Sequence, residues 1–359
     1  MKAANHFPTD YRSARAAFIE AAEGAGLGVT SRPHPAATGA DGKKLFLDTA
    51  TMGPREAKKA LLMISATHGV EGYFGSGAET GLLREGLPAR VPEGAKVVIV
   101  HALNPYGFSW DRRVNEDNAD INRNFVDHAN PPANEAYDLL HDAIAPKDIS
   151  PENVKKANAK LRAYRDAHGA FKLQEAISAG QYKHSDGLYF GGSRESWSAR
   201  MLKDVFREEL VGVERLIAVD FHTGLGEHGA AEMITEDLPG TPAYARAKKL
   251  WGDYVRSSEA GESLSAPLKG TIDAAIAAWM AGRELTFAAL EVGTRSMRAV
   301  LSALRDDNWL HMHGRMDDTR APAIKAAIRD GFYPETDQWK QSVYRHAQDV
   351  VGAAIRALG

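Results

Sequence analysis

The chain carries four short, unbroken runs of apolar residues, each bounded by polar or glycine-containing segments. Continuous hydrophobicity is typical of strands that are buried on both faces of a parallel or mixed sheet. Strands with one solvent-exposed face instead alternate apolar and polar residues. A fifth run, residues 44–48, does alternate and is predicted as an edge strand. The unbroken runs predict core strands at residues 60–66, 96–102, 215–221 and 285–290.

Other segments repeat apolar residues three and four positions apart, which is the spacing of a helix that buries one face. Because strands alternate with helices, we expect an α/β fold: a three-layer α/β/α sandwich around a mixed, mostly parallel sheet. A single domain, residues 1–359, can accommodate this length. The predicted helices are residues 197–210, 242–255, 272–280 and 343–358.

Residues 127–195 interrupt this alternation, because they are polar and helix-prone and end in the glycine-rich turn DGLYFGG. We interpret them as a helical insertion within the domain, over the sheet edge. Two interpretations stay open for this insertion: a lid over a site, or a surface excursion without function.

The composition narrows the available chemistry. The chain has no cysteine, which leaves histidine and carboxylate side chains to hold any metal. Its formal net charge is -3, from 44 basic and 47 acidic residues, so neither nucleic acid nor a membrane is expected as a partner. The N-terminus lacks the apolar stretch of a secretory signal, and we expect a cytoplasmic protein.

The side chains best suited to catalysis follow the predicted strands at their carboxyl ends. In open α/β sheets, ligands bind in the crevice beyond these ends, so loops from different strands can meet in one site. The residues concerned are His68 and Glu71 after the first core strand, Asn104 after the second, His222 after the third and Glu291 at the end of the fourth.

His68 and Glu71 lie three residues apart in a turn flanked by glycines, where both can face one cation. A nitrogen from a distant strand would complete a set of three protein ligands. Three ligands with an open water position is the arrangement of catalytic zinc, whereas structural zinc usually has four. The isolated His-x-x-Glu pair is weak evidence, because such pairs also cap helices or lie solvated at surfaces.

Residues 110–125, WDRRVNEDNADINRNF, are dense in arginine, asparagine and aspartate. An arginine fork binds a carboxylate bidentately and a neighbouring asparagine adds an amide donor, so the segment is a candidate anion clamp. The composition alone favours the alternative, a solvated loop held together by its own side chains.

These features, in this order along residues 60–294, jointly resemble the zinc carboxypeptidase family. The similarity is to its aspartoacylase-like and succinylglutamate desuccinylase-like deacylases, or to proteins near them. The motif HTGLG after the third strand is similar to that of a bacterial branch of the family. The resemblance implies a zinc-carboxypeptidase-like fold and one zinc ion as cofactor. It assigns His68, Glu71 and His222 as the zinc ligands and Glu291 as the general base.

The same resemblance assigns roles in the arginine-rich segment. Arg113 matches the arginine that polarises the scissile carbonyl and stabilises the oxyanion, although the adjacent Arg112 is an alternative match. Asn122 and Arg123 match the pair that binds a substrate carboxylate.

Some polar and aromatic residues stay unassigned. Carboxypeptidases of this family use a mobile tyrosine between the third ligand and the base; Tyr244 and Tyr254 lie in that interval, but neither matches a motif, so the role is left empty. Several histidines are interpreted as packed or solvated because none has a matching partner set in the sequence: His101, His184, His228, His311 and His313.

The sequence therefore predicts an enzyme, a zinc metallohydrolase that cleaves an amide bond in a small carboxylate-bearing substrate, as N-acyl amino acid deacylases do. One alternative is a carboxypeptidase that acts on short or cell-wall-derived peptides. Another is a non-catalytic metal-binding protein, although such a protein needs no general base. A small-molecule amide or short peptide is the expected partner, and assembly into a homo-oligomer is left open.

Overall fold

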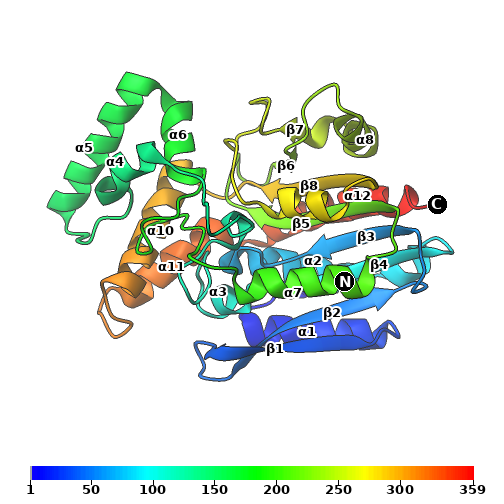
Figure 1. Cartoon of the computed structure of the whole chain (residues 1–359). Helices are drawn as coiled ribbons and strands as arrows, with labels where there is room; N and C mark the ends of the chain where they lie inside the picture. The colour runs from blue at the N-terminus through cyan, green and yellow to red at the C-terminus, as the bar shows by residue number, and fades with distance from the viewer. Residues whose placement is uncertain (1) are drawn as a thin grey trace.

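A computed structural model describes residues 2–359 and places one eight-stranded sheet at the centre of the molecule (Figure 1). The strands are ordered β1-β2-β4-β3-β5-β8-β6-β7. The central strands β4, β3, β5 and β8 are parallel, whereas β1 with β2, β2 with β4 and β6 with β8 pair antiparallel. The bounds are β1 Val29–Thr38, β2 Lys44–Met52, β3 Lys59–Ile64, β4 Ala95–His101, β5 Arg215–Thr223, β6 Ala231–Thr235, β7 Val255–Ser257 and β8 Glu284–Val292.

The four unbroken apolar runs form the four central strands, as predicted. The prediction of an edge strand at residues 44–48 is wrong, because β1 pairs with the outer side of β2. The strand β1 is polar and contains Pro33 and Pro35, so it lacks the apolar pattern of a strand. A missing proline N–H is tolerated at the edge of a sheet, which is where β1 lies.

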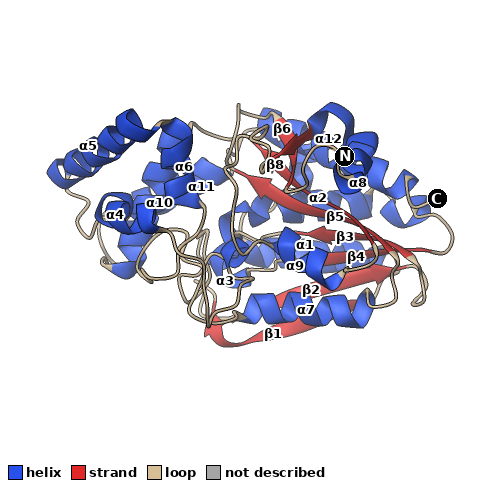
Figure 2. Cartoon of the chain, turned by 45° about the horizontal axis from the view of Figure 1, so that its top comes forward, coloured by secondary structure: helices blue, strands red, loops and turns tan. Residues whose placement is uncertain are grey.

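Helices cover both faces of the sheet and complete the three layers (Figure 2). One face is covered by α1, α2, α8 and α12, which bury residues such as Phe18, Phe74 and Val351. The other is covered by α7 and α9, which bury Leu202 and Ile276. The helices outside the insertion are α1 Tyr11–Gly24, α2 Gly72–Arg84, α3 Pro105–Ser109, α7 Trp197–Glu209, α8 Pro242–Trp251, α9 Ile272–Trp279, α10 Met297–Met312, α11 Ala321–Phe332 and α12 Asp337–Arg356.

The predicted helices agree with α7, α9 and residues 343–356 of α12. The helix predicted at residues 242–255 ends early, because Gly252 has a φ of 57° and directs the chain into β7. Five short 3-10 helices join the larger elements: η1 Ala3–His6, η2 Gly69–Glu71, η3 Leu87–Arg90, η4 Ile121–Arg123 and η5 Gly252–Tyr254. Over residues 2–359, no helix has the length and apolarity needed to cross a membrane.

Residues 127–195 contain three helices that lie together at one end of the sheet (Figures 1 and 2). Their apolar side chains, Tyr137 and Ile177 among them, join Val300 of α10 and Phe332 of α11 in one cluster. The insertion therefore packs on α10 and α11, and not over the edge strands as the sequence suggested. The three helices are α4 Glu135–Ile144, α5 Pro151–His168 and α6 Ala170–Ser178.

Candidate active site

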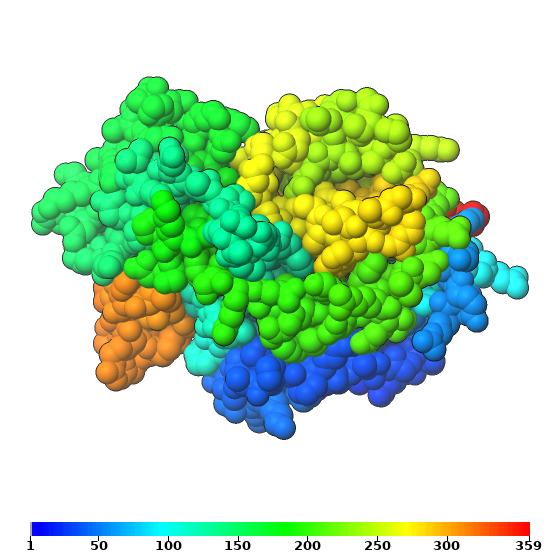
Figure 3. Space-filling view, viewed as in Figure 1, coloured from blue at the N-terminus to red at the C-terminus, as the bar shows by residue number. Residues whose placement is uncertain are grey.

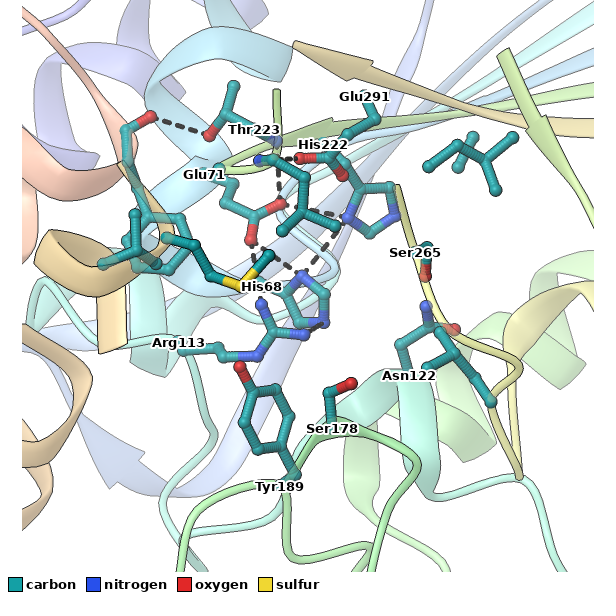
Figure 4. A pocket seen from close by; sticks show the side chains of 18 of the residues that line it. His68, Glu71, Arg113, Asn122, Ser178, Tyr189, His222, Thr223, Ser265 and Glu291 are labelled. Carbon is teal, nitrogen blue, oxygen red and sulfur yellow. Dashed lines mark hydrogen bonds and ion pairs between the residues drawn. The ribbon is translucent and has the colours of Figure 1, made fainter. Parts of the chain in front are cut away.

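The carboxyl ends of β3, β5 and β8 meet at one pocket (Figure 4). His68 and Glu71 come from the turn after β3, and His222 of β5 lies opposite Glu291 of β8 in the parallel register. All four line the pocket, which confirms the expected convergence of these loops. Asn104 does not line it: its Oδ1 accepts a hydrogen bond from the Gly107 N–H and caps α3.

The ligand turn is held against α3 by close backbone packing. A Cβ at Gly69 would lie 2.0 Å from the carbonyl carbon of Gly107, so only glycine fits at position 69. The Gly69 N–H donates to the carbonyl oxygen of Arg113 at 3.1 Å, and the Val70 N–H donates to that of Arg112 at 2.8 Å. These bonds fix the turn relative to the arginine-rich segment.

The three proposed ligands face one another in a geometry that suits zinc. The Glu71 carboxylate oxygens lie 2.9 Å from His68 Nδ1 and 3.0 Å from His222 Nδ1, and the two Nδ1 atoms are 3.2 Å apart. A tetrahedral zinc shell with bonds of about 2.0–2.1 Å separates its ligand atoms by roughly 3.3 Å. All three side chains are buried, and their donor atoms could hold one metal ion.

Two buried aspartates contact the far nitrogens of these histidines. Asp220 Oδ2 lies 2.8 Å from His222 Nε2, and Asp120 Oδ1 lies 3.1 Å from His68 Nε2. At His222 the Asp220 carboxylate holds the proton on Nε2 and leaves Nδ1 free to bind a metal, whereas His68 Nε2 also lies 2.7 Å from Arg113 Nη2. Sequence reasoning missed both aspartates, although Asp220 precedes His222 by two residues and Asp120 lies in the DINRNF segment.

Glu291 stands beside the ligand set with one oxygen held. Its Oε1 accepts a hydrogen bond from the Leu225 N–H at 2.8 Å. Burial, and then the nearby charge of Glu71, raises the pKa of Glu291 to about 8. In Glu71, burial favours the neutral form, but His68 and His222 outweigh it and lower the pKa below its ordinary value. The neighbours of the two carboxyl groups thus move their pKa values in opposite directions.

Arg113 and Arg112 point to different places. The Arg113 guanidinium lines the pocket, where Nε donates to Asp120 Oδ2 at 2.9 Å and Nη1 donates to Glu71 Oε1 at 3.2 Å. Arg112 instead donates to Asp307 Oδ2 at 3.1 Å and does not line this pocket. The fold brings Arg113, and not Arg112, to the candidate metal ligands.

Asn122 and Arg123 also line the pocket. Three of the five Arg123 N–H groups donate to backbone oxygens, two to Ser178 and one to Asn122, which leaves two for a ligand. Asn122 Oδ1 accepts a hydrogen bond from the Ile272 N–H, so its NH2 group remains to contact a ligand. The arginine is buried and held in place before any ligand arrives.

Tyr189 is a pocket residue that sequence reasoning missed. It lies in the DGLYFGG turn, with a φ of 53°, and the Arg113 guanidinium carbon is 5.1 Å from its ring centroid. Burial raises the pKa of Tyr189 against the opposing effect of Arg113, so the phenol keeps its proton. Tyr244 and Tyr254 do not line the pocket; their hydroxyls contact Glu262 and His346.

The overall fold resembles that of solved structures. Bovine thrombin-activatable fibrinolysis inhibitor, in complex with tick carboxypeptidase inhibitor, is 10% identical with a TM-score of 0.50, over 98% of this chain and 97% of that one. A metallo-carboxypeptidase from Pseudomonas aeruginosa, in complex with (2-guanidinoethylmercapto)succinic acid, is 17% identical with a TM-score of 0.41, over 95% and 69%. The first likeness confirms the expected carboxypeptidase-like α/β fold, and only the fold.

No curated protein matches the chain. Residues 7–346 match the model of a family whose description is a protein of unknown function, DUF2817.

Proposed function

Because the chain belongs to the DUF2817 family, whose description names no reaction, we propose a function from the site itself. The protein is a zinc-dependent hydrolase that cleaves an amide bond in a small, carboxylate-bearing substrate. The observation that carries this proposal is Glu291, a buried carboxyl group in register with His222 and next to a three-ligand set. A site that only bound metal would need no further buried carboxyl group at this position, whereas hydrolysis needs a proton acceptor beside the activated water.

His68, Glu71 and His222 would hold the zinc, which when bound acts as a Lewis acid and lowers the pKa of water to about 7. Glu291 takes the proton from the attacking water and later delivers it to the leaving amine. The Leu225 N–H bond to Oε1 orients this carboxyl group and leaves Oε2 for the proton. No covalent enzyme intermediate is required.

Arg113 stabilises the charge that develops on the carbonyl oxygen of the substrate. Its guanidinium lies against His68 and Glu71, with Nη2 2.7 Å from His68 Nε2, so the positive charge is already beside the candidate metal ligands. A donor fixed in place before the reaction costs no reorganisation when the charge appears.

Asn122 and Arg123 bind the substrate carboxylate. The two free N–H groups of Arg123 and the NH2 group of Asn122 supply the donors that such a group needs. A carboxylate held there fixes the distance of the amide bond from the metal ligands, which favours productive orientation.

The insertion, residues 127–195, serves as a lid on this pocket. Gln174, Ile177 and Ser178 of α6 line it together with Ile234 of β6. The insertion and the segment from β6 to α9 face each other across a hollow in the surface (Figure 3). Such a wall limits the length of substrate that can enter, which supports small amides over long peptides.

A carboxypeptidase that acts on short or cell-wall-derived peptides is the second candidate. The apolar side chains that line the pocket, including Leu225, Leu268 and Leu301, suit an apolar residue next to the carboxylate in a dipeptide as well as in an acylated amino acid. Both candidates use the same residues and differ only in the group on the acyl side of the scissile bond.

Metal analysis combined with a substrate screen tests the proposal. We expect one zinc ion at this site and turnover of either N-acyl amino acids or dipeptides, with much slower turnover of the same compounds as C-terminal amides. Glu291→Gln is the control, because it should keep the metal and lose turnover. Zinc binding without turnover of any compound, or undiminished turnover in Glu291→Gln, would contradict the proposed mechanism.

A further inference from the structure

A second group of histidine and aspartate side chains lies outside the pocket. His141 is in the last turn of α4, His184 and Asp186 are in the loop between α6 and α7, and His313 follows α10. One ligand atom from each of His141, His184 and Asp186 lies within 4.8 Å of the others. The insertion and α10 therefore bring together residues that are far apart in the sequence.

The contacts within this group leave nitrogen lone pairs available. Asp138 Oδ1 lies 3.0 Å from His184 Nε2, so in the neutral ring the proton lies on Nε2 and Nδ1 keeps its lone pair. His141 Nε2 lies 3.3 Å from Asp186 Oδ1, and its buried Nδ1 has no hydrogen-bond partner among residues 2–359. One histidine thus has the carboxylate partner typical of a metal ligand, and the other has an unused nitrogen.

The two imidazole rings stack with centroids 3.9 Å apart and an angle of 15° between their planes. Two positively charged rings would repel at this distance, so the arrangement requires at least one neutral imidazole, which is the form that binds metals. Asp186 supplies the negative charge, and His313 Nε2 lies 3.6 Å from its Oδ2.

We propose that His141, His184 and Asp186 bind a second divalent transition-metal ion, with His313 as the adjacent fourth donor. Two imidazole nitrogens and one carboxylate suit zinc and its late first-row neighbours, whereas calcium and magnesium prefer sites made of oxygen alone. The side chains are only partly exposed, with 16%, 28% and 26% of their area accessible, so an ion can enter from solvent and still lose most of its water.

This ion connects three elements to the catalytic pocket. It joins α4 and the end of α10 to the loop that contains Tyr189, three residues after Asp186. The loop is already held by the Asn308 side chain, which donates to the Asp186 carbonyl oxygen at 2.8 Å, and by the Gln181 N–H, which donates to that of Tyr189. The metal holds the His184 and Asp186 side chains of the same loop and so orders Tyr189 within the pocket.

Zinc stoichiometry of the full-length protein tests the proposal. Wild type should bind two equivalents after equilibration with zinc, and His184→Gln and Asp186→Asn should each bind one. His168→Ala is the matched control, because this exposed histidine lies on the same insertion and should leave two equivalents bound. Retention of the first equivalent shows that each variant is folded, and two equivalents in both variants would overturn the proposal.

A variant that lacks the catalytic ligands separates this site from the proposed function. His68→Ala combined with His222→Ala should still bind one zinc ion, and zinc should slow amide hydrogen exchange in residues 181–192. Adding His184→Gln to this variant should abolish both effects. If the catalytic-ligand variant binds no zinc, or if exchange in residues 181–192 does not change, the second site is refuted whether or not the protein is a hydrolase.

Discussion

Asp220 Oδ2 lies 2.8 Å from His222 Nε2, within the same strand β5, and both side chains are buried. Asp220 also accepts a hydrogen bond from the Thr67 hydroxyl at 2.9 Å, so its carboxylate is held on two sides. We expect Asp220→Asn to weaken zinc binding by about 10- to 100-fold, since it no longer fixes the His222 tautomer. Titration against a competing chelator measures the zinc affinity of the variant and of wild type. Unchanged affinity would show that the backbone alone orients His222.

Zinc binding should release a proton from Glu291. Burial and the charge of Glu71 raise the pKa of Glu291 to about 8 without metal, so the group is mostly protonated near pH 7. A divalent cation beside it favours the carboxylate and lowers this pKa. Near pH 7 wild type should therefore release up to about one proton more than Glu291→Gln, with no difference well above pH 8. Calorimetry in buffers of different ionisation enthalpy measures the release, and equal release at neutral pH would contradict the assignment.

Arg113 and Arg112 should respond differently to replacement by alanine. Arg113→Ala removes the proposed oxyanion donor, and we expect kcat to fall by about 10²- to 10³-fold with zinc retained. Arg112→Ala removes one of the two cationic partners of buried Asp307, which keeps Lys325, and we expect a loss of about 1.5–3 kcal/mol of unfolding free energy. Kinetics and denaturant unfolding on both variants separate the two effects, and the reverse pattern would restore Arg112 as the oxyanion donor.

Tyr189 lines the pocket, although it precedes His222 and so lies outside the interval in which the resemblance places a tyrosine. If its phenol donates a hydrogen bond to the substrate, Tyr189→Phe should lower kcat by about tenfold, which corresponds to one such bond. The ring stays beside Arg113, so zinc content and Tm should not change. Wild-type kcat in this variant would restrict Tyr189 to packing.

Glu79 of α2 should make the protein less stable as pH rises. Its Oε2 accepts a hydrogen bond from the Ser65 hydroxyl, and its buried Oε1 has no partner within residues 2–359. Burial raises the pKa of Glu79 well above its ordinary 4.5, so the folded state keeps a proton that the unfolded chain releases above that pH. Stability then falls as pH rises beyond 4.5.

Glu79→Gln isolates this contribution because glutamine is neutral at every pH. Its Tm should exceed that of wild type at about pH 8, and the two should converge at about pH 4. Thermal unfolding over this pH range measures the difference. A constant offset between the two curves would mean that Glu79 does not titrate in this way.

The central strands were predictable because strands buried on both faces carry an unbroken apolar signal, as β3 to β5 do. The helix α2 was not, because its four glycines lower helix propensity. In the fold these glycines allow close packing: a Cβ at Gly75, for example, would lie 2.5 Å from the Ser65 Cβ. Tertiary packing therefore outweighs the local preference.

The residues of the candidate site were likewise predictable only in part from the sequence. His68, Glu71 and His222 could be found because each follows a predictable strand in a short motif. The adjacent arginines could not be distinguished, because only the tertiary fold turns Arg112 toward Asp307. The partners of His184 could not be found either, because they come from other elements.

The close packing at Gly69 has a consequence for the energetics of metal binding. The backbone bonds from residues 69 and 70 to the arginine-rich segment immobilise the ligand turn as the chain folds. The conformational entropy of arranging the ligands is therefore lost during folding, and little of it remains to be lost when an ion arrives. A bulkier residue at position 69 would shift that entropic cost to the binding step and weaken the affinity without removing a single ligand.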